Sequence, residues 1–111
     1  MKLILFISCL LILQACVKHP VDCCLPPQQE MVRTQTQCAD AWGYGESNEE
    51  TITKLTNFLL QKNIVVAKIT LQSTGEEVTC LACTCSRGYI IHVWVEQQYT
   101  ERLSKEGFTR K

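Results

Sequence analysis

Eight cysteines in a chain of 111 residues can act as metal ligands, redox groups or cross-links, depending on the compartment in which they fold. The chain begins with Met1 and Lys2, and residues 3–13 then read LILFISCLLIL. One basic residue before an unbroken apolar run is the layout of a secretory signal peptide. The run is shorter than the roughly 18 apolar residues that a transmembrane helix needs. Because exported cysteines form disulfides, we expect a small cross-linked domain.

The end of the apolar run, Leu13-Gln14-Ala15-Cys16, resembles the lipobox of bacterial lipoproteins, although Gln14 is bulkier and more polar than usual. The resemblance implies that the Cys16 thiol carries a diacylglyceryl group. It also implies cleavage just before Cys16 and acylation of the new amine, for example with palmitate. Two or more chains make a stable anchor in a lipid bilayer. The alternative is ordinary cleavage after Ala15, which would leave a plain N-terminal cysteine.

The resemblance also divides the chain. We expect a lipoprotein signal peptide over 1–15, a lipidated Pro- and Cys-containing tether over 16–29, and a single domain over 30–111. Val17 and Lys18 follow Cys16 where an Asp would favour retention at the inner membrane. By resemblance to enteric sorting rules, this favours the outer membrane for the exported protein. The leaflet and the face of the membrane stay open.

Once Cys9 leaves with the signal peptide and Cys16 takes lipid, an even number of cysteines remains. These are Cys23, Cys24, Cys38, Cys80, Cys83 and Cys85. An even count in an exported chain predicts a disulfide framework. Neighbouring cysteines rarely bond to each other, because the geometry of a disulfide is hard to meet between them. We therefore expect the three upstream cysteines to pair with the three downstream ones, in an order that the sequence leaves open.

The segment Cys80-Leu-Ala-Cys83-Thr-Cys85 has three further interpretations. Three close thiolates suit a soft or borderline metal ion, although a zinc finger would use two Cys-x-x-Cys units. Cys80 and Cys83 could form a redox pair, but an active pair usually begins a helix. The segment could also be a binding loop whose shape is held by bridges.

Sequence patterns predict one secure helix and several strands. Ser47 with Glu50 is typical of a capping box, Leu55 and Leu59 share a helical face with Ile52, and Asn63 is a plausible stop. Strands are predicted over 64–72, 76–81 and 89–96, joined by short glycine-containing links into an antiparallel meander. Residues 31–37 predict a weak edge strand, and 97–106 a closing helix that ends at Gly107. The fold class is therefore α+β, a small disulfide-stapled domain.

Few residues are candidates for binding. Trp42 and Tyr44 alternate with glycines and could present a stacking surface, unless Trp42 fills the core. His92 and Trp94 share the strand face opposite Ile91, which is either covered by the terminal helix or partly open. We expect no cofactor, no metal unless the Cys80–Cys85 segment binds one, and no enzyme activity, because no catalytic motif is present.

The mature chain, without Lys2, has ten basic and eleven acidic side chains, so we expect no nucleic-acid partner. The expected partners are the lipid bilayer, through acylated Cys16, and an envelope protein or glycan. The leading hypothesis is a non-catalytic binding or structural module at the cell envelope, whose surface combines the Trp42–Gly45 loop with the Cys80–Gly88 turn. The alternative is a metal-binding or thiol-redox protein.

Overall fold

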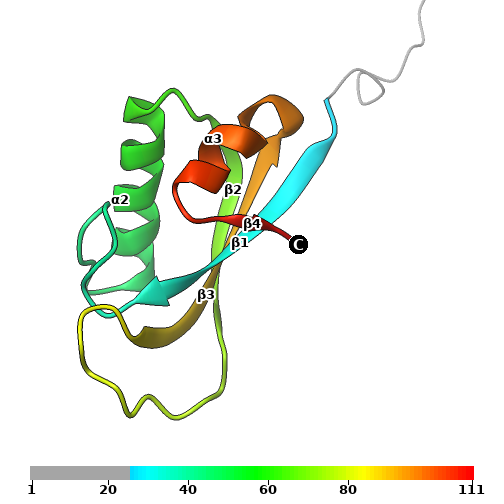
Figure 1. The fold of residues 1–111 in the computed structure, drawn as a ribbon. Helices are drawn as coiled ribbons and strands as arrows, with labels where there is room; N and C mark the ends of the chain where they lie inside the picture. Colours follow the sequence, from blue (N-terminus) through cyan, green and yellow to red (C-terminus); the bar gives the residue numbers. More distant parts are fainter. Residues whose placement is uncertain (1–25) are drawn as a thin grey trace, which may run out of the picture.

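The computed structural model describes residues 26–111, which form one four-stranded antiparallel sheet and two α-helices (Figure 1). The strands are β1 (Gln28–Thr36), β2 (Val66–Ser73), β3 (Ser86–Glu96) and β4 (Thr109–Arg110). The helices are α2 (Asn48–Gln61) and α3 (Thr100–Lys105), the second preceded by the 3-10 turn η2 (Gln97–Tyr99). The order across the sheet is β2-β3-β1-β4. With two disulfides in addition, the predicted α+β class is confirmed.

Helix α2 begins as the capping pattern predicts. The Oγ of Ser47 accepts a hydrogen bond from the backbone N–H of Glu50 at 3.1 Å. The Glu50 carboxylate in turn accepts from the N–H of Glu46 at 3.2 Å, one residue before the cap. The first bond satisfies an amide group that a helix start otherwise leaves without a partner, and the second holds the residue before the cap against the helix. The buried face of the helix carries Leu55 and Leu59.

The end of α2 is a left-handed turn at Asn63, whose φ is +60°. The N–H of Ile64 donates to the carbonyl of Leu59 at 2.9 Å, and that of Asn63 donates to Leu60 at 3.0 Å. These two bonds define a Schellman motif, in which Asn tolerates the left-handed conformation better than most residues. Ile64, the next residue, is buried and starts the path into β2.

The predicted position of the first strand is wrong. Strand β1 lies inside the sheet, paired with β3 from Gln28 to Thr36 and with β4 at Met31 and Val32. It also begins two residues before the expected domain boundary at 29/30. Its polar composition predicted an edge, but strand preference depends strongly on the neighbours that a strand packs against. Here the eleven-residue β3 provides a long apolar neighbour.

The predicted strand over 76–81 is also absent. Residues 74–85 form no strand, so β2 and β3 are joined by one long loop. Only Val78 and Leu81 among residues 76–81 are strongly apolar, and both are exposed. A meander would place this segment between β2 and β3, but β2 pairs directly with β3, and β1 pairs with the other side of β3. The sheet is therefore built from distant parts of the chain and not from a local meander.

A β-bulge changes which residues of β2 face the core. The register with β3 shifts between Val66 and Lys68, so Ala67 has no partner of its own. Val66 packs against the core with Ile69 and Leu71, whereas strict alternation from Ile69 would place Ala67 there. A bulge adds one residue to one strand and so reverses the alternation beyond it.

Both helices pack on one face of the sheet. The inward side chains of β3 are completely buried and meet Leu55 and Leu59 of α2 and Leu103 of α3. The buried core consists of Met31, Trp42, Leu55, Leu59, Ile64, Ile91, Val93, Val95, Leu103 and Phe108. The other face of the sheet carries His92 and Trp94, and no helix of the described residues covers it (Figure 1). His92 is nevertheless only 7% exposed, whereas Trp94 is partly exposed, so this face is open only in part.

The two ends of the sheet differ in what they carry. At one end Gln28 pairs with Glu96, and we call it the β1-start end. At the other, Thr36 pairs with Ser86 beside the long 74–85 loop, and we call it the loop end. Figure 1 shows the 74–85 loop and the start of β1 at opposite extremes of the domain. Nine strand residues, at about 3.3 Å each, separate the two ends by roughly 30 Å.

Candidate functional site

Two disulfides cross-link the loop end. One joins Cys38, just after β1, to Cys83, and the other joins Cys80 to Cys85 within the 74–85 loop. The expectation that each downstream cysteine pairs with an upstream one is therefore wrong for Cys80 and Cys85. The chain turns back between them, because the N–H of Cys85 donates to the carbonyl of Ala82 at 3.0 Å, and their Cα atoms lie 5.8 Å apart. Cys16, Cys23 and Cys24 lie outside the described residues.

Hydrogen bonds from Gln37 and Cys38 also hold this loop, in addition to the disulfides. The backbone N–H of Gln37 donates to the carbonyl of Cys85 at 2.8 Å. Its side-chain amide donates to the carbonyls of Cys80 and Ser86 at 3.4 and 3.2 Å. The next N–H, of Cys38, donates to Cys83 at 3.1 Å. The loop is thus fixed to the end of β1 by backbone pairing as well as by a covalent bond.

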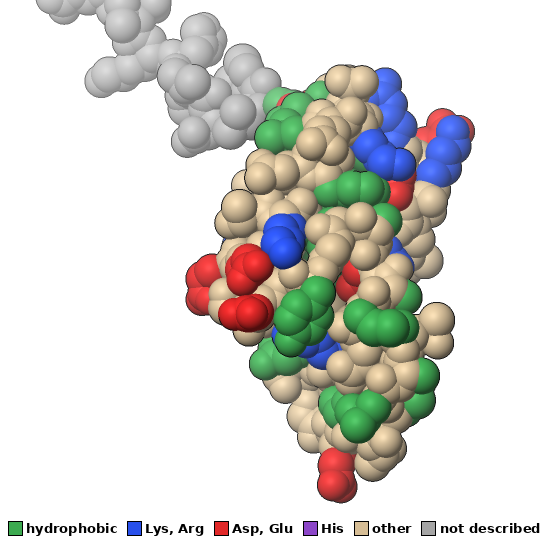
Figure 2. Space-filling model, turned by 90° about the vertical axis from the view of Figure 1, so that its left-hand side faces the viewer, with side chains coloured by type: hydrophobic (Ala, Val, Ile, Leu, Met, Phe, Trp, Pro, Cys, Tyr) green, Lys and Arg blue, Asp and Glu red, His purple; other side chains and the backbone are tan. Residues whose placement is uncertain are grey.

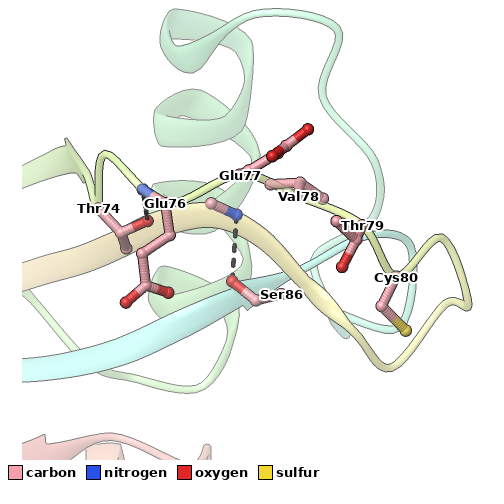
Figure 3. A pocket seen from close by; sticks show the side chains of 8 residues that line it. Thr74, Glu76, Glu77, Val78, Thr79, Cys80 and Ser86 are labelled. Atoms are coloured by element: carbon pink, nitrogen blue, oxygen red, sulfur yellow. Dashed lines mark hydrogen bonds between the residues drawn. The ribbon is translucent and has the colours of Figure 1, made fainter.

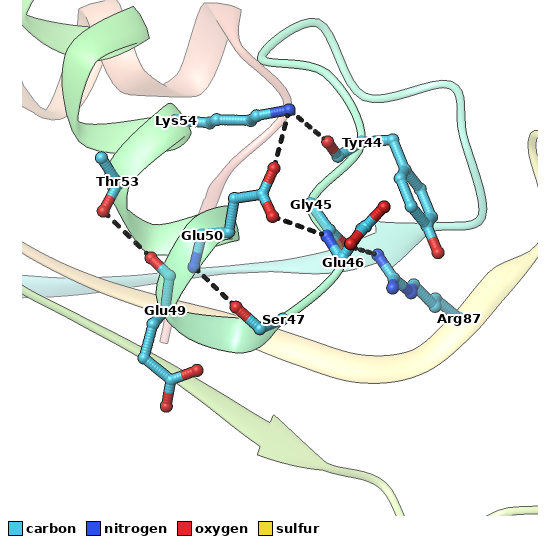
Figure 4. Close-up of polar contacts among 9 residues, drawn as sticks. All are labelled: Tyr44, Gly45, Glu46, Ser47, Glu49, Glu50, Thr53, Lys54 and Arg87. Atoms are coloured by element: carbon cyan, nitrogen blue, oxygen red, sulfur yellow. Dashed lines mark hydrogen bonds and ion pairs between the residues drawn. The ribbon is translucent and has the colours of Figure 1, made fainter.

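The Trp42–Gly45 loop packs against this loop end, next to the Cys80–Gly88 turn with which the sequence analysis grouped it. The Arg87 guanidinium lies 4.4 Å from the centre of the Tyr44 ring and donates to the carbonyl of Gly45 at 2.9 Å (Figure 4). On the other side, the Lys54 ammonium donates to the carbonyl of Tyr44 and pairs with Glu50 at 3.2 Å. Sequence reasoning did not single out Arg87, since an isolated Arg in a turn carries no pattern.

Trp42 does not belong to this surface. It is only 6% exposed and lies in the core, where its ring meets the edge of Phe58 at a centroid distance of 6.0 Å. The Arg33 guanidinium covers the ring at 4.7 Å. This is the core-filling alternative, so the Trp42 ring is not available to stack on a ligand. Tyr44, in contrast, is 53% exposed.

Gly45 has no room for a side chain. A Cβ there would lie 2.8 Å from the backbone nitrogen of Thr51 and 3.0 Å from its Cα, which are backbone atoms that cannot easily move. We expect Gly45→Ala to lower the free energy of unfolding by about 2 kcal/mol, as overpacking does elsewhere. Urea denaturation measures this. Gly43→Ala is the matched control: φ there is +91° but the space is open, so it tests backbone strain alone. An equal loss in both variants would contradict the steric explanation.

The 74–85 loop exposes apolar side chains at its tip. Leu81, between the two bridges, is 81% exposed, and Val78 is 39% exposed. We call Tyr44, Val78 and Leu81 the loop surface. Burying these aliphatic groups against a partner would be favourable, because apolar surface would be removed from water. Here the cross-links and the Gln37 hydrogen bonds fix the backbone that carries them.

A shallow pocket of about 130 Å³ lies beside the loop surface (Figure 3). Thr74, Glu76, Glu77, Val78, Thr79, Cys80, Ser86 and Gly88 line it. Figure 3 shows the Glu76 and Glu77 side chains pointing to different sides of the segment. The two carboxylates therefore do not converge as a catalytic acid–base pair would. The pocket adds polar and negatively charged groups to the edge of the loop surface.

His92 lies away from the loop end, in the middle of β3. Its Nδ1 is 2.7 Å from Oε1 of Glu30, and Trp94 stacks beside it at a centroid distance of 6.1 Å. The Lys111 ammonium lies 3.3 Å from the same carboxylate oxygen. The structure thus joins His92 to Trp94 but to neither Trp42 nor Tyr44. The hydrogen bond from His92, and then that from Lys111, hold the pKa of Glu30 below its ordinary value.

The lowered pKa of Glu30 predicts an acid-sensitive contribution to stability. A carboxyl group with a folded pKa below its unfolded pKa stabilises the fold above the unfolded pKa, and this contribution disappears as the pH falls through the folded pKa. We expect His92→Gln to raise the pKa of Glu30 toward its ordinary value, and Lys111→Gln to raise it less. Carboxyl-carbon NMR titration measures both. An unchanged Glu30 pKa in His92→Gln would contradict the assigned cause.

The Cys80–Cys85 segment offers no free thiolate to a metal ion, because Cys80, Cys83 and Cys85 are all in disulfides. Over residues 26–111, no group of three or more His, Cys, Asp or Glu side chains is placed to hold a metal ion.

Searches of protein-family models, curated proteins and solved structures find no match. In the same described range, no helix has the length and apolar character required to span a bilayer.

Proposed function

We propose that this chain is a lipid-anchored, non-catalytic binding module of the bacterial cell envelope, and that the loop surface binds a partner protein. One observation carries the proposal: Leu81 stays 81% exposed on a loop that two disulfides fix in place. A binding loop that is rigid before it meets its partner loses less conformational entropy on association. Tyr44 adds an aromatic ring, the kind of side chain that often dominates binding energy.

The charges around the loop surface support a partner of particular chemistry. Glu76 and Glu77 are exposed at its edge, while Arg87 is engaged with Tyr44 and Gly45. The surface therefore offers apolar contacts with a negative rim, which favours a partner with an apolar patch flanked by Lys or Arg. In Figure 2, hydrophobic side chains on the face shown occur in separate small groups. A contact of limited area suits such a surface better than a large permanent interface.

The position of the loop surface also supports anchoring at the other end. The proposed tether leads into β1, which begins at Gln28 at one end of the sheet, and the loop surface lies at the opposite end. A domain attached through Cys16 would therefore present Leu81 away from its own membrane.

The binding proposal is tested with a photo-crosslinking amino acid at position 81 of the lipoprotein, in cells. We expect a discrete adduct, and the same probe at exposed Lys105 on α3 as a control should give none. The purified partner should then bind Leu81→Ser at least about tenfold more weakly than the natural protein, since a buried Leu contributes roughly 1.5–3 kcal/mol. Equal binding by both forms, or no adduct at position 81, would contradict the proposal.

The anchor is tested separately. We expect the intact mass of the mature protein to start at Cys16 and to include a diacylglyceryl group and an amide-linked fatty acid. Cys16→Ala should abolish palmitate labelling, because the substituted chain has no thiol to carry the acyl chains that anchor the protein. A mature protein with an unmodified Cys16 would contradict lipidation.

A further inference from the structure

The turn between α2 and β2 exposes two aliphatic side chains. Leu60 is 49% and Val65 53% exposed, on either side of the Schellman turn at Asn63. The turn is fixed to the neighbouring helix, because the Arg102 guanidinium of α3 donates to the carbonyl of Asn63 at 2.9 Å. These side chains are therefore presented by an ordered backbone, and we call Leu60 and Val65 the turn surface.

The turn surface lies at the β1-start end. Val66, the residue after Val65, pairs with Val95, and Gln28 pairs with the next residue, Glu96. Figure 1 shows the end of α2 and the start of β1 at the same extreme of the domain. The twelve residue-to-residue steps from Cys16 to Gln28 can span at most about 40 Å. An anchor at Cys16 would keep Gln28 within that distance of the bilayer, and the turn surface lies at the same end of the sheet as Gln28.

We infer that the turn surface inserts into the headgroup region of the bilayer that holds the acyl anchor, an inference that rests on the proposed function. Two aliphatic side chains would not recruit a free protein to a membrane, but a short covalent tether turns docking into an intramolecular event. Apolar groups at a membrane surface bind through the apolar area that they bury. The loop surface then faces away from the bilayer.

The charges at this end do not favour anionic lipid strongly. Lys62 is paired with Glu106 at 2.9 Å, and Arg102 has exposed Glu101 as its neighbour in the chain. The contact is therefore expected to depend on Leu60 and Val65, and to persist on vesicles of zwitterionic lipid as well as on vesicles that contain anionic lipid.

The test is hydrogen exchange, followed by mass spectrometry, on the acylated protein in phosphatidylcholine vesicles, with and without phosphatidylglycerol. We expect amides of residues 60–66 to exchange about tenfold more slowly than in an unlipidated Cys16→Ala chain that starts at residue 16 and is kept in solution. The double variant Leu60→Ser/Val65→Ser should lose this protection on vesicles, and Leu81→Ser should keep it. The double variant made in the Cys16→Ala chain reports any purely structural effect of the substitutions.

Three results would overturn the inference: no protection of residues 60–66 on vesicles, protection of residues 76–86 instead, or equal protection in the double variant. The intact mass is recorded first, so that the two proposals fail separately. An acylated protein without protection contradicts only the bilayer contact. An unmodified Cys16 contradicts the proposed anchor, and the contact with it.

Discussion

Replacing Cys38 and Cys83 together with alanine is expected to lower the free energy of unfolding by about 4 kcal/mol. The bond joins residues 45 positions apart, and a cross-link that closes a loop of this length removes much of the entropy of the unfolded chain. The free energy is measured by urea denaturation of the folded domain, with the other bridge intact. A typical domain has only 5–15 kcal/mol in total, so this loss is a large fraction.

The second bridge provides the matched control. Cys80 and Cys85 are only five positions apart, and the same entropy model gives about 2 kcal/mol for the pair of alanine substitutions. If the Cys38→Ala/Cys83→Ala variant does not fold, the ranking is still tested, since Cys80→Ala/Cys85→Ala should fold and stay cooperative. Equal losses in the two variants, or a larger loss for the short loop, would show that loop closure does not govern stability here.

Arg33→Met is expected to lower the free energy of unfolding by about 3 kcal/mol, because Arg33 is the ion-pair partner of a buried carboxylate. Its guanidinium pairs with Asp40 at 3.3 Å, donates to the carbonyl of Glu106 at 3.0 Å and covers the Trp42 ring. The Asp40 side chain is only 5% exposed, so removing the cation leaves a buried carboxylate without its ion pair. Urea denaturation measures the loss.

Two further variants separate the charge from the geometry. Arg33→Lys keeps the charge but not the planar fork that reaches both partners, so we expect it to recover only part of the loss. Asp40→Asn in the Arg33→Met background removes the unpaired charge, and Thr36 can still donate to the remaining side-chain oxygen. This double variant should therefore be more stable than Arg33→Met alone. Additive losses would contradict a direct interaction between the two residues.

The local elements of the fold were predictable because their signals are local. The capping residues Ser47 and Glu50 fix where α2 begins, and the alternation of Ile91 and Val93 predicts β3. The partners of β3 were not predictable. Strand β1 is polar in sequence and lies about sixty residues away, so no nearby pattern connects it to β3. The sequence-based meander failed because it assumed that neighbouring strands in the chain are neighbours in the sheet.

The candidate site shows the same division. The sequence brought the Trp42–Gly45 loop and the Cys80–Gly88 turn together as one hypothesis, and the contact of Arg87 with Tyr44 confirms that they are adjacent. It could not show that Trp42 is buried and Tyr44 exposed, since both are aromatic residues beside glycines. No sequence pattern indicated that Leu81 is exposed, because a single leucine occurs both in cores and on loops.

The central place of β1 has a consequence for how the chain matures. Under the proposed export, the chain crosses the membrane from its N-terminus, and β1 emerges long before the strand that completes it. Another 44 residues must cross the membrane after Cys38 before its partner Cys83 is exported. Cys80 and Cys85 can bond as soon as both are outside. During that interval the nearest thiols to Cys38 in the chain are Cys23 and Cys24. Correct pairing therefore depends on delayed oxidation or on an isomerase that can undo an early bond.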